Sequence, residues 1–426
     1  MRQVVWGVLL TVALAGISQA KVSQSAASAA AKDEIEVEIP LETVVFANGK
    51  VMSLTVGIGS AAAHGPGDPA NVVYFLTDRG PNIDCEEDLE IIGTDLCSKG
   101  KIFPTPQFSP AIYAMELDFE AGTATVKSIT SLKDSERIPV SGLPNPLKDT
   151  ELAFATSGKP LPLDANGLDS EGLVKMADGS FWVAEEYAPS LVHVAADGRI
   201  LERLVPHGVA KQLVGATYPV TEVFPAVVAK RKLNRGFESV AASPDGKFLY
   251  VALQSPLANP DNDAYKKSRN VRIFKLDVDS KTIIGEYVYV LDTPDTFKKD
   301  NERKSRKQSD VRISDMVAYE NDKVIVLERI SKTTKLYAVN LSEATNVKEK
   351  WDGEKSALEL VDNLASAGIA PVEKKLVWNT DTVSGYPSKI EGVAVVDKGT
   401  LVLVNDNDFG IEGDATKVRL VKLPLP

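Results

Sequence analysis

One sequence pattern recurs along this chain and constrains its fold more than any other feature. In each copy an acidic residue precedes a short apolar run, a turn, and a second apolar run that ends in polar or charged residues. The copies begin at Glu171, Glu238, Asp315 and Glu391, in steps of 67, 77 and 76 positions. Apolar runs rich in β-branched residues on both sides of a turn predict β-hairpins.

The last copy shows the geometry that we expect of all of them. Val393–Val396 pairs with Thr400–Val404 across a turn at Asp397–Gly399. Antiparallel pairing returns the end of the second strand to the start of the first. Glu391 and the polar cluster Asn405–Asp408 should therefore meet at one edge of the sheet.

A long repeat of short strands with one turn each is typical of radially repeated sheets, and the spacing suits four-stranded propeller blades. A more diverged copy runs from Ser60 to Asp78, and the step from Ser60 to Glu171 is longer than the others. Either the cysteine loop and Pro139–Pro162 fill this excess, or it hides a further blade. We predict an all-β propeller with six blades, with five or seven as alternatives, closed by pairing of Glu34–Phe46 with Val418–Leu423.

The first residues of the sequence predict an exported protein. Residues 1–20 read as a signal peptide, with Arg2, the apolar run Val4–Ile17 and a small-residue cleavage site near Ala20. Residues 21–33 form a flexible linker, and residues 34–426 form a single propeller domain. We expect a monomer, secreted or periplasmic, with no transmembrane segment, since no other stretch is apolar enough to span a bilayer.

The cysteine content predicts a disulfide, and the net charge limits the kinds of binding partner. The two cysteines, Cys85 and Cys97, lie in one loop, and export favours a disulfide between them. Such a bridge stabilises by roughly 3 kcal/mol for a loop of this length. The net charge of −11 argues against nucleic acid as a partner. A basic segment at Lys298–Lys307 is most simply a solvated loop, although at the mouth it would steer anions.

Five stretches of the chain resemble a known family. They are DRGPN at 78–82, EGLVKMADGSFWVAEEYAPS at 171–190, NRGFESVAASPDGKFLYVALQSP at 234–256, ISDMVAYENDKVIVLER at 313–329, and KIEGVAVV with NDNDFG between 389 and 410. The chain resembles the phytase-like family, also described as having the esterase-like activity of phytase. This resemblance implies a propeller-like β fold and acidic residues that carry phosphoester hydrolysis. Ser239 departs from the glycine that follows the acid at 171 and 391, which predicts an altered backbone there.

The repeated acids suggest a metal site. In a propeller the first strand of each blade lines the axis, so the carboxylates would converge on one central mouth, where unpaired burial is costly. A hard divalent cation with oxygen ligands, Ca²⁺ above others, would neutralise them. The predicted ligands are Asp78, Glu171, Glu238, Asp315, Glu391 and Asp406. The alternative is a structural latch in which these acids pair with Arg79, Arg329, Lys389 and backbone amides.

The same mouth suggests chemistry. No serine lies in a nucleophile elbow, so hydrolysis would depend on a water activated by the metal. Glu171 or Glu185 would accept the proton, and Arg79 and Arg329 would stabilise developing charge on a small anionic substrate such as an organic phosphate. We expect hydrolysis of phosphomonoesters or phosphodiesters. Hydrolysis of lactones or carboxylic esters, and a non-catalytic calcium-stabilised binding module, are the alternatives.

Overall fold

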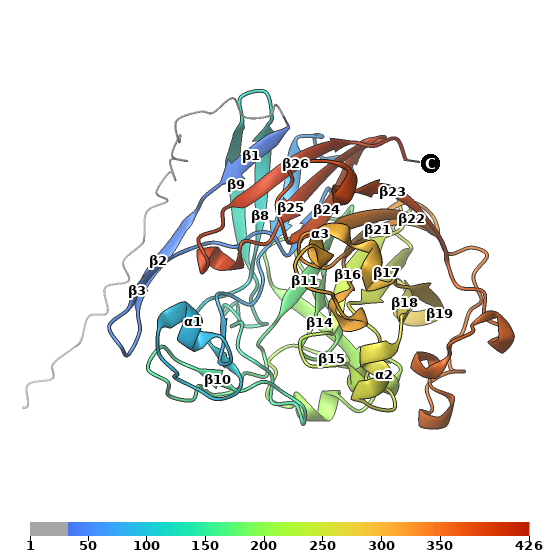
Figure 1. Ribbon diagram of the computed structural model, residues 1–426, viewed down its shortest axis with the longest axis horizontal. Helices are drawn as coiled ribbons and strands as arrows, with labels where there is room; N and C mark the ends of the chain where they lie inside the picture. Colours follow the sequence, from blue (N-terminus) through green and yellow to red (C-terminus); the bar gives the residue numbers. More distant parts are fainter. Residues whose placement is uncertain (1–32, 426) are drawn as a thin grey trace, which may run out of the picture.

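The computed structural model describes residues 33–425, and its dominant feature is a ring of five mainly antiparallel sheets. We call these sheets blades 1 to 5 (Figure 1). The first strands of the blades are neighbours in a closed cycle, because β4 contacts β11, β11 contacts β16, β16 contacts β20, β20 contacts β24, and β24 contacts β4. The described residues therefore form five such sheets and not the six expected.

The strands of the blades follow the sequence in order except at the closure. Blade 1 contains β4 (Ala61–Ala63), β5 (Val72–Leu76), β8 (Ala111–Asp118) and β9 (Thr123–Ser131). Blade 2 contains β11 (Ser170–Lys175), β12 (Phe181–Glu185), β13 (Ser190–Val194), β14 (Ile200–Pro206) and β15 (Val220–Phe224), the last parallel to its neighbour. Blade 3 contains β16 (Phe237–Ala242), β17 (Phe248–Leu253), β18 (Asn270–Asp277) and β19 (Thr282–Val290). Blade 4 contains β20 (Arg312–Glu320), β21 (Lys323–Arg329), β22 (Thr334–Asn340) and β23 (Glu373–Asn379).

Blade 5 joins the two ends of the described chain. It contains β24 (Ile390–Asp397), β25 (Thr400–Asn405), β26 (Thr416–Lys422) and β1 (Glu34–Val37). Strands β1 and β26 pair antiparallel from Glu34 opposite Arg419 to Val37 opposite Thr416, which confirms the predicted closure. The predicted strand Glu34–Phe46 is in fact divided, since β2 (Pro40–Val45) leaves blade 5 and pairs with β3 (Val51–Thr55).

The extra residues between Ser60 and Glu171 form a lobe rather than a hidden blade. The lobe holds a small sheet of β6 (Ile83–Asp84), β7 (Lys101–Ile102) and β10 (Ala153–Phe154), with helix α1 (Asp88–Ile92). The predicted disulfide between Cys85 and Cys97 is present and closes this lobe. The β2–β3 hairpin packs against it through a shared apolar cluster and lies next to it in Figure 1.

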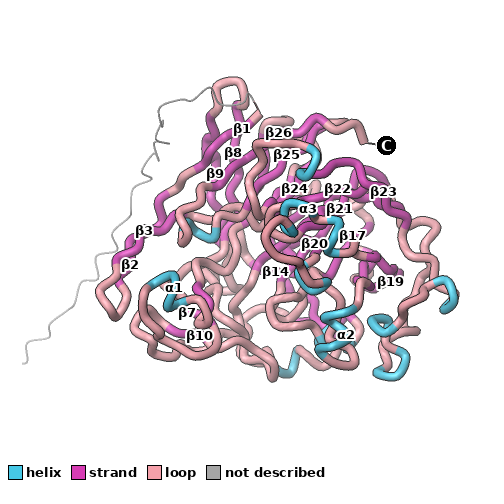
Figure 2. Tube along the Cα trace, viewed as in Figure 1, coloured by secondary structure: helices cyan, strands magenta, loops and turns pink. Residues whose placement is uncertain are grey.

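Helices are few and short, as the tube view shows (Figure 2). The remaining α-helices are α2 (Asn262–Lys267) and α3 (Lys298–Asn301). The 3₁₀ turns are η1 (Ala210–Gln212), η2 (Ala226–Lys230), η3 (Pro294–Thr296), η4 (Gln308–Asp310), η5 (Glu354–Ser356), η6 (Leu358–Leu360), η7 (Ala365–Ala367), η8 (Thr380–Thr382) and η9 (Asp408–Gly410). Within residues 33–425 no helix is long and apolar enough to cross a membrane. The predicted signal peptide lies outside the described residues.

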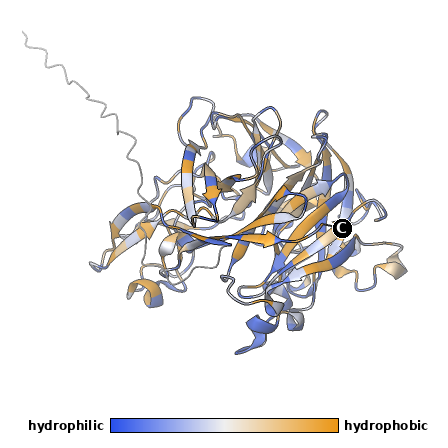
Figure 3. Ribbon diagram, turned by 90° about the horizontal axis from the view of Figure 1, so that it is seen from above, coloured by the Kyte–Doolittle hydropathy of each residue, from blue (hydrophilic) through white to orange (hydrophobic). Residues whose placement is uncertain are grey.

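The hydrophobic core lies between blades, and the strands carry most of the apolar residues (Figure 3). The largest cluster joins blades 2, 3 and 4 around fully buried side chains such as Phe237, Tyr250 and Phe274. Each such side chain contributes about 1.5–3 kcal/mol by leaving water. Packing on both faces of each sheet makes the inner strands a rigid support for the residues at their ends.

Candidate functional site

The acid that opens the repeated motif lies at a β-bulge. In blade 2, Ser170 pairs with Glu185 and Gly172 pairs with Ala184, which leaves Glu171 unpaired between them. The pairing of β16 with β17 skips Glu238 in the same way, and the pairing of β24 with β25 skips Glu391. A bulge adds one residue to one strand and redirects its side chain. Three of the predicted ligands therefore occupy equivalent backbone positions.

The bulge also corrects the prediction for blade 4. There the register shift skips Ser314, and Asp315 is paired with Leu327. The Asp315 carboxylate is buried and accepts hydrogen bonds from the backbone N–H groups of Met316 and Val393, both at 2.8 Å. Asp315 thus ties β20 to β24 and does not join the other acids, because one position along a strand reverses the direction of a side chain.

A residue at the end of the second strand of each hairpin, or one or two positions beyond it, forms the other half of the pattern. By register these residues are Glu186, Gln254, Arg329 and Asp406, with Asp78 in the corresponding place of blade 1. Gln254 donates to Glu238 at 2.6 Å, and Arg329 Nε donates to Ser314 at 2.7 Å. In blades 3 and 4, therefore, a hydrogen bond joins the bulge residue to the residue at the end of the second strand.

Glu185, a predicted catalytic residue, faces away from this pattern. Its carboxylate is fully buried and forms an ion pair of 2.6 Å with Arg203. It also accepts hydrogen bonds from the backbone of Tyr187 and the hydroxyl of Ser190, both at 2.7 Å. Glu185 is the last residue of β12 and pairs with Ser170, and Glu186 follows it. Glu186 therefore occupies the position at the mouth that we predicted for Glu185.

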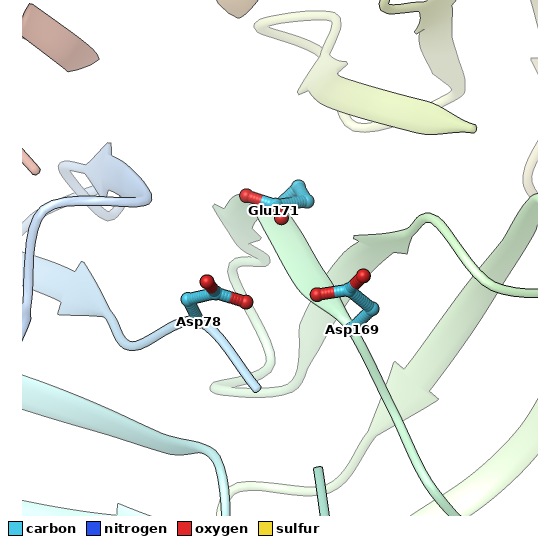
Figure 4. A group of neighbouring side chains, drawn as sticks. All are labelled: Asp78, Asp169 and Glu171. Carbon is cyan, nitrogen blue, oxygen red and sulfur yellow. The ribbon is translucent and has the colours of Figure 1, made fainter. Parts of the chain in front are cut away.

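Five carboxylates gather in two overlapping groups. In the first, one oxygen each from Asp78, Asp169 and Glu171 lie within 4.8 Å of one another (Figure 4). In the second, the same holds for Glu171, Glu186 and Glu238. Asp169 was not predicted, although its position two residues before Glu171 was the available signal. Glu171 belongs to both groups and comes from the strand nearest the axis.

Burial and mutual repulsion make the charged forms of these carboxyl groups unfavourable. Burial raises the pKa of Glu171 well above its usual value, with Asp78, Glu238, Asp169 and Glu186 adding to the effect. Burial likewise raises the pKa of Asp169 and Glu238. Neither carboxylate oxygen of Asp169 accepts a hydrogen bond from the described residues. Arg79 lies 2.9 Å from Asp169, but among residues 33–425 no ion pair joins a basic side chain to Glu171, Glu186 or Glu238.

Asp406 and Glu391 extend the acidic region towards blade 5. Burial, together with Glu391 and Asp78, raises the pKa of Asp406 to about 8. Glu391 forms an ion pair with Arg329, as the structural-latch alternative predicts for one pair. These two predicted ligands lie beside the carboxylate groups but not within either triplet.

Arg79 lies at the other edge of the acidic region and is almost fully buried. Its Nη1 atom lies 2.8 Å from Glu151 and 2.9 Å from Asp169, and its Nη2 atom donates to Asn234 at 2.7 Å. Arg79 thus neutralises part of the charge of Asp169. It fixes the loop after β5 against the loop before β16.

The donor set fits a hard divalent cation. All the converging atoms are carboxylate oxygens, which Ca²⁺ and similar ions prefer, and Asp169 offers two buried oxygens without a hydrogen-bond partner among the described residues. Neither group includes histidine or cysteine, the ligands typical of zinc. The acidic clusters are therefore compatible with a metal site.

A cleft of about 550 Å³ opens beside the acids, and Asp78 is the member of the acidic groups that lines it. The lobe forms one wall through residues such as Asn82 and Ile83, and blade 5 forms another through Glu391 and Phe409. Three arginines also line it, namely Arg235, Arg312 and Arg329. Arg235 and Arg312 were not among the predicted site residues, because their positions before the bulges have no acidic signature.

Comparisons with known proteins found a relative, several solved structures and a family model. An uncharacterized secreted protein of Arthroderma benhamiae is 31% identical over 140 residues, which cover 30% of this chain and 27% of that protein. The chain thus spans about a quarter of the length of this relative.

Two solved structures align over most of the chain at low similarity. The PQQ-bound aldose sugar dehydrogenase of Streptomyces coelicolor has 8% identity and a TM-score of 0.34, covering 91% of this chain and 95% of its own. The calcium-binding protein regucalcin of Agrobacterium tumefaciens has 12% identity and a TM-score of 0.34, covering 91% and 96%. Scores this low support no argument about fold or function.

The model of one family matches residues 103–409, well over half of the chain. Four of the motif stretches fall within or overlap this range, including the bulges of blades 2 to 5. The chain therefore belongs to the phytase-like family, whose description is esterase-like activity of phytase.

Proposed function

We propose that this protein is an exported, metal-dependent hydrolase of phosphoric esters. The observation that carries the proposal is the convergence of five carboxylates, in two groups that share Glu171, beside a cleft lined by three arginines. The family description, esterase-like activity of phytase, supports ester hydrolysis. The signal-like segment, the disulfide and the name of the secreted relative support export.

The acids would hold the metal, with Ca²⁺ as the preferred ion. Asp78, Asp169 and Glu171 offer one set of oxygens, and Glu186 and Glu238 complete a second set with Glu171. A divalent cation bound there supplies Lewis acidity, which polarises a phosphoryl oxygen and lowers the pKa of a water. The predicted ligands Glu391 and Asp406 lie farther out and would adjust the charge of the site.

The remaining steps belong to the protein's own side chains. Asp78 and Glu171 are partly exposed, unlike Asp169, Glu186 and Glu238. Glu171 belongs to both groups, so we assign to it the acceptance of a proton from water. Arg329, held by Ser314 and Glu391, would stabilise negative charge on the phosphoryl oxygens. Arg79 orients Asp169 through their close contact. Glu186 replaces Glu185 in this scheme, because Glu185 is committed to Arg203.

Metal removal tests the proposal directly. The purified protein should release phosphate from aryl phosphates or phytate, lose this activity in EDTA, and regain it when Ca²⁺ or another divalent cation is restored. Elemental analysis of the purified protein should find the metal bound in stoichiometric amount. Turnover that survives EDTA, or turnover of lactones without any release of phosphate, would contradict the proposal.

A non-catalytic protein would give a different pattern. Ca²⁺ would raise the melting temperature while all phosphate and carboxylic esters stayed intact. That outcome would favour a calcium-stabilised binding module over an enzyme.

A further inference from the structure

The arginines of the cleft form a second charged cluster, and the proposed function gives a role to only one of them, Arg329. Arg235, Arg312 and Arg329 line the same cleft. Arg312 opens β20 and pairs directly with Arg329 at the end of β21. Like charges directly opposite each other on neighbouring strands are destabilising. Arg329 has Glu391 as its counter-charge, which leaves Arg312 to be compensated.

Arg312 is the member of this cluster without a partner. Its side chain makes no hydrogen bond or ion pair with any residue in the range 33–425, and its Nε atom is buried. Burial, with the neighbouring Arg235 and Arg329 adding to it, lowers the pKa of Arg312 to about 9, while Glu391 and Glu238 act in the opposite direction. A guanidinium group that is left without acceptors in a cleft is costly.

The acids at the rim of the cleft do not fill this role. Asp84 forms an ion pair with Lys101 at 3.0 Å, Asp408 forms one with Lys389, and Glu391 forms one with Arg329. Two more acids of the cleft, Glu87 and Glu412, are exposed to solvent, and the last, Asp78, belongs to the acidic groups. After this pairing, Arg312 and Arg235 remain the positive groups that face the cleft.

Arg235 is placed by a tight turn that the fold requires. Asn234 has a φ of +57°, and a Cβ on Gly236 would lie 2.2 Å from the backbone oxygen of Glu186. Only glycine permits this close approach, and the Gly236 N–H donates to the Glu186 carboxylate at 3.1 Å. The turn thus fixes Arg235 between the acidic groups and Arg312.

We propose that Arg312 and Arg235, together with Arg329, form a subsite for a dianionic phosphoryl group, so that the substrate class is phosphomonoesters rather than diesters or neutral lactones. The hydrolysis of that class rests on the proposed function, whereas the binding does not. A guanidinium group offers five N–H donors in a planar fork that matches two oxygens of a phosphoryl group. A dianion compensates the facing arginines more fully than a monoanion does, and a lactone does not compensate them.

Binding of two analogues with phosphorus–carbon bonds tests the subsite without turnover. At about pH 8.5 methylphosphonate is largely a dianion and dimethylphosphinate is a monoanion, by the same logic that gives a phosphate monoester its second charge above pH 6. Calorimetry and thermal melting would be measured with Ca²⁺ and again in EDTA. We expect the wild-type protein to bind methylphosphonate roughly tenfold more tightly than dimethylphosphinate.

Substitutions assign the binding to the named residues. Arg312→Gln should weaken methylphosphonate binding roughly tenfold or more, since a charge-assisted bidentate contact is lost. It should also raise the melting temperature in anion-free buffer, because the repulsion with Arg329 disappears. Arg312→Lys, which keeps the charge, should lose less affinity, and Arg235→Gln tests the subsite without altering the β20–β21 pair. Arg137→Gln removes an exposed arginine outside the cleft and should bind like the wild type.

The outcomes separate this inference from the proposed function. Equal affinity for the two analogues, or unchanged binding in both Arg312→Gln and Arg235→Gln, overturns the subsite even if metal-dependent hydrolysis is found. Binding that weakens as expected in a protein that hydrolyses no phosphoric ester leaves the subsite standing and overturns the hydrolase.

Discussion

Blades 2 and 4 bring the same two backbone positions to the central cleft and fill them with opposite chemistry. In blade 2 the bulge residue is Glu171 and the residue after the second strand is Glu186, and both belong to the acidic groups. In blade 4 these positions hold Ser314 and Arg329, which are joined by a hydrogen bond of 2.7 Å. Blade 3 is intermediate, because Glu238 is acidic but bonded to Gln254.

The difference shows how one repeated backbone can build a site with two sides. Equivalent positions guarantee that the side chains meet at the axis, but their charges decide what they bind. The acids of blades 1, 2 and 3 face one part of the mouth, and the arginines before and after the bulges of blades 3 and 4 face another. A cation and an anionic group can therefore lie side by side in one cleft.

The sharpest test within blade 2 compares two adjacent glutamates. Glu185→Gln should lower the free energy of unfolding by about 3–5 kcal/mol, because it leaves the buried Arg203 without its counter-charge. Glu186→Gln should leave the stability of the metal-free protein unchanged or higher, since burial already raises the pKa of Glu186 and favours its neutral form. Urea denaturation measures both.

Calcium titration completes this comparison. Affinity should fall about tenfold in Glu186→Gln, by loss of a charged ligand. Glu185→Gln should retain its affinity under conditions where it is folded. A reversed pattern would mean that the register argument assigns the wrong neighbour to the site.

A second test compares substitutions at the bulge residues of blades 2 and 4. Glu171→Gln should reduce metal-dependent hydrolysis roughly a hundredfold or more, equivalent to about 2.7 kcal/mol of transition-state stabilisation. Ser314→Ala removes one hydrogen bond to Arg329 and should cost about 1 kcal/mol, or less than about tenfold. Steady-state kinetics with saturating metal would compare them. Equal losses would show that the two sides of the mouth do not have the separate roles inferred here.

The smallest expected effect concerns pH. The pKa of Asp406 is raised to about 8 in the folded protein, whereas an unfolded Asp titrates near 4. The stabilising contribution of the protonated form is therefore complete below about pH 4 and is lost as the pH rises through about 8. In EDTA, the melting temperature of the wild type should fall between pH 6 and pH 9 by a few degrees more than that of Asp406→Asn.

Calcium should diminish this pH dependence, because a cation favours the charged carboxylates. Melting curves that run parallel for wild type and Asp406→Asn across this range would show that Asp406 titrates normally. The cleft would then be more hydrated than its burial suggests.

Several features of the fold were predictable because they depend on local sequence. The hairpin Val393–Val404, the disulfide between Cys85 and Cys97, and the closure by the terminal strands are all confirmed. Alternating apolar residues and turn residues act over a few positions, so they can be recognised without a structure. The family motifs likewise extend over contiguous stretches.

The number of blades was not predictable in this way. The excess length between Ser60 and Glu171 contains short strands, and local patterns do not tell a lobe of three short strands from a further blade. The β2–β3 hairpin and the lobe bury each other's apolar faces, which removes the need for another sheet in the ring.

The sequence by itself determined that acids recur at the starts of hairpins, and hence that a β fold would gather negative charge from distant parts of the chain. Only the tertiary structure decided which acids meet. A bulge of one residue selects Ser314 over Asp315, and the position after a strand selects Glu186 over Glu185. It also brings Arg235 and Arg312 into the cleft. The physical reason is that side chains alternate along a strand, so a shift of a single residue, which no local pattern marks, reverses the direction in which a charge points.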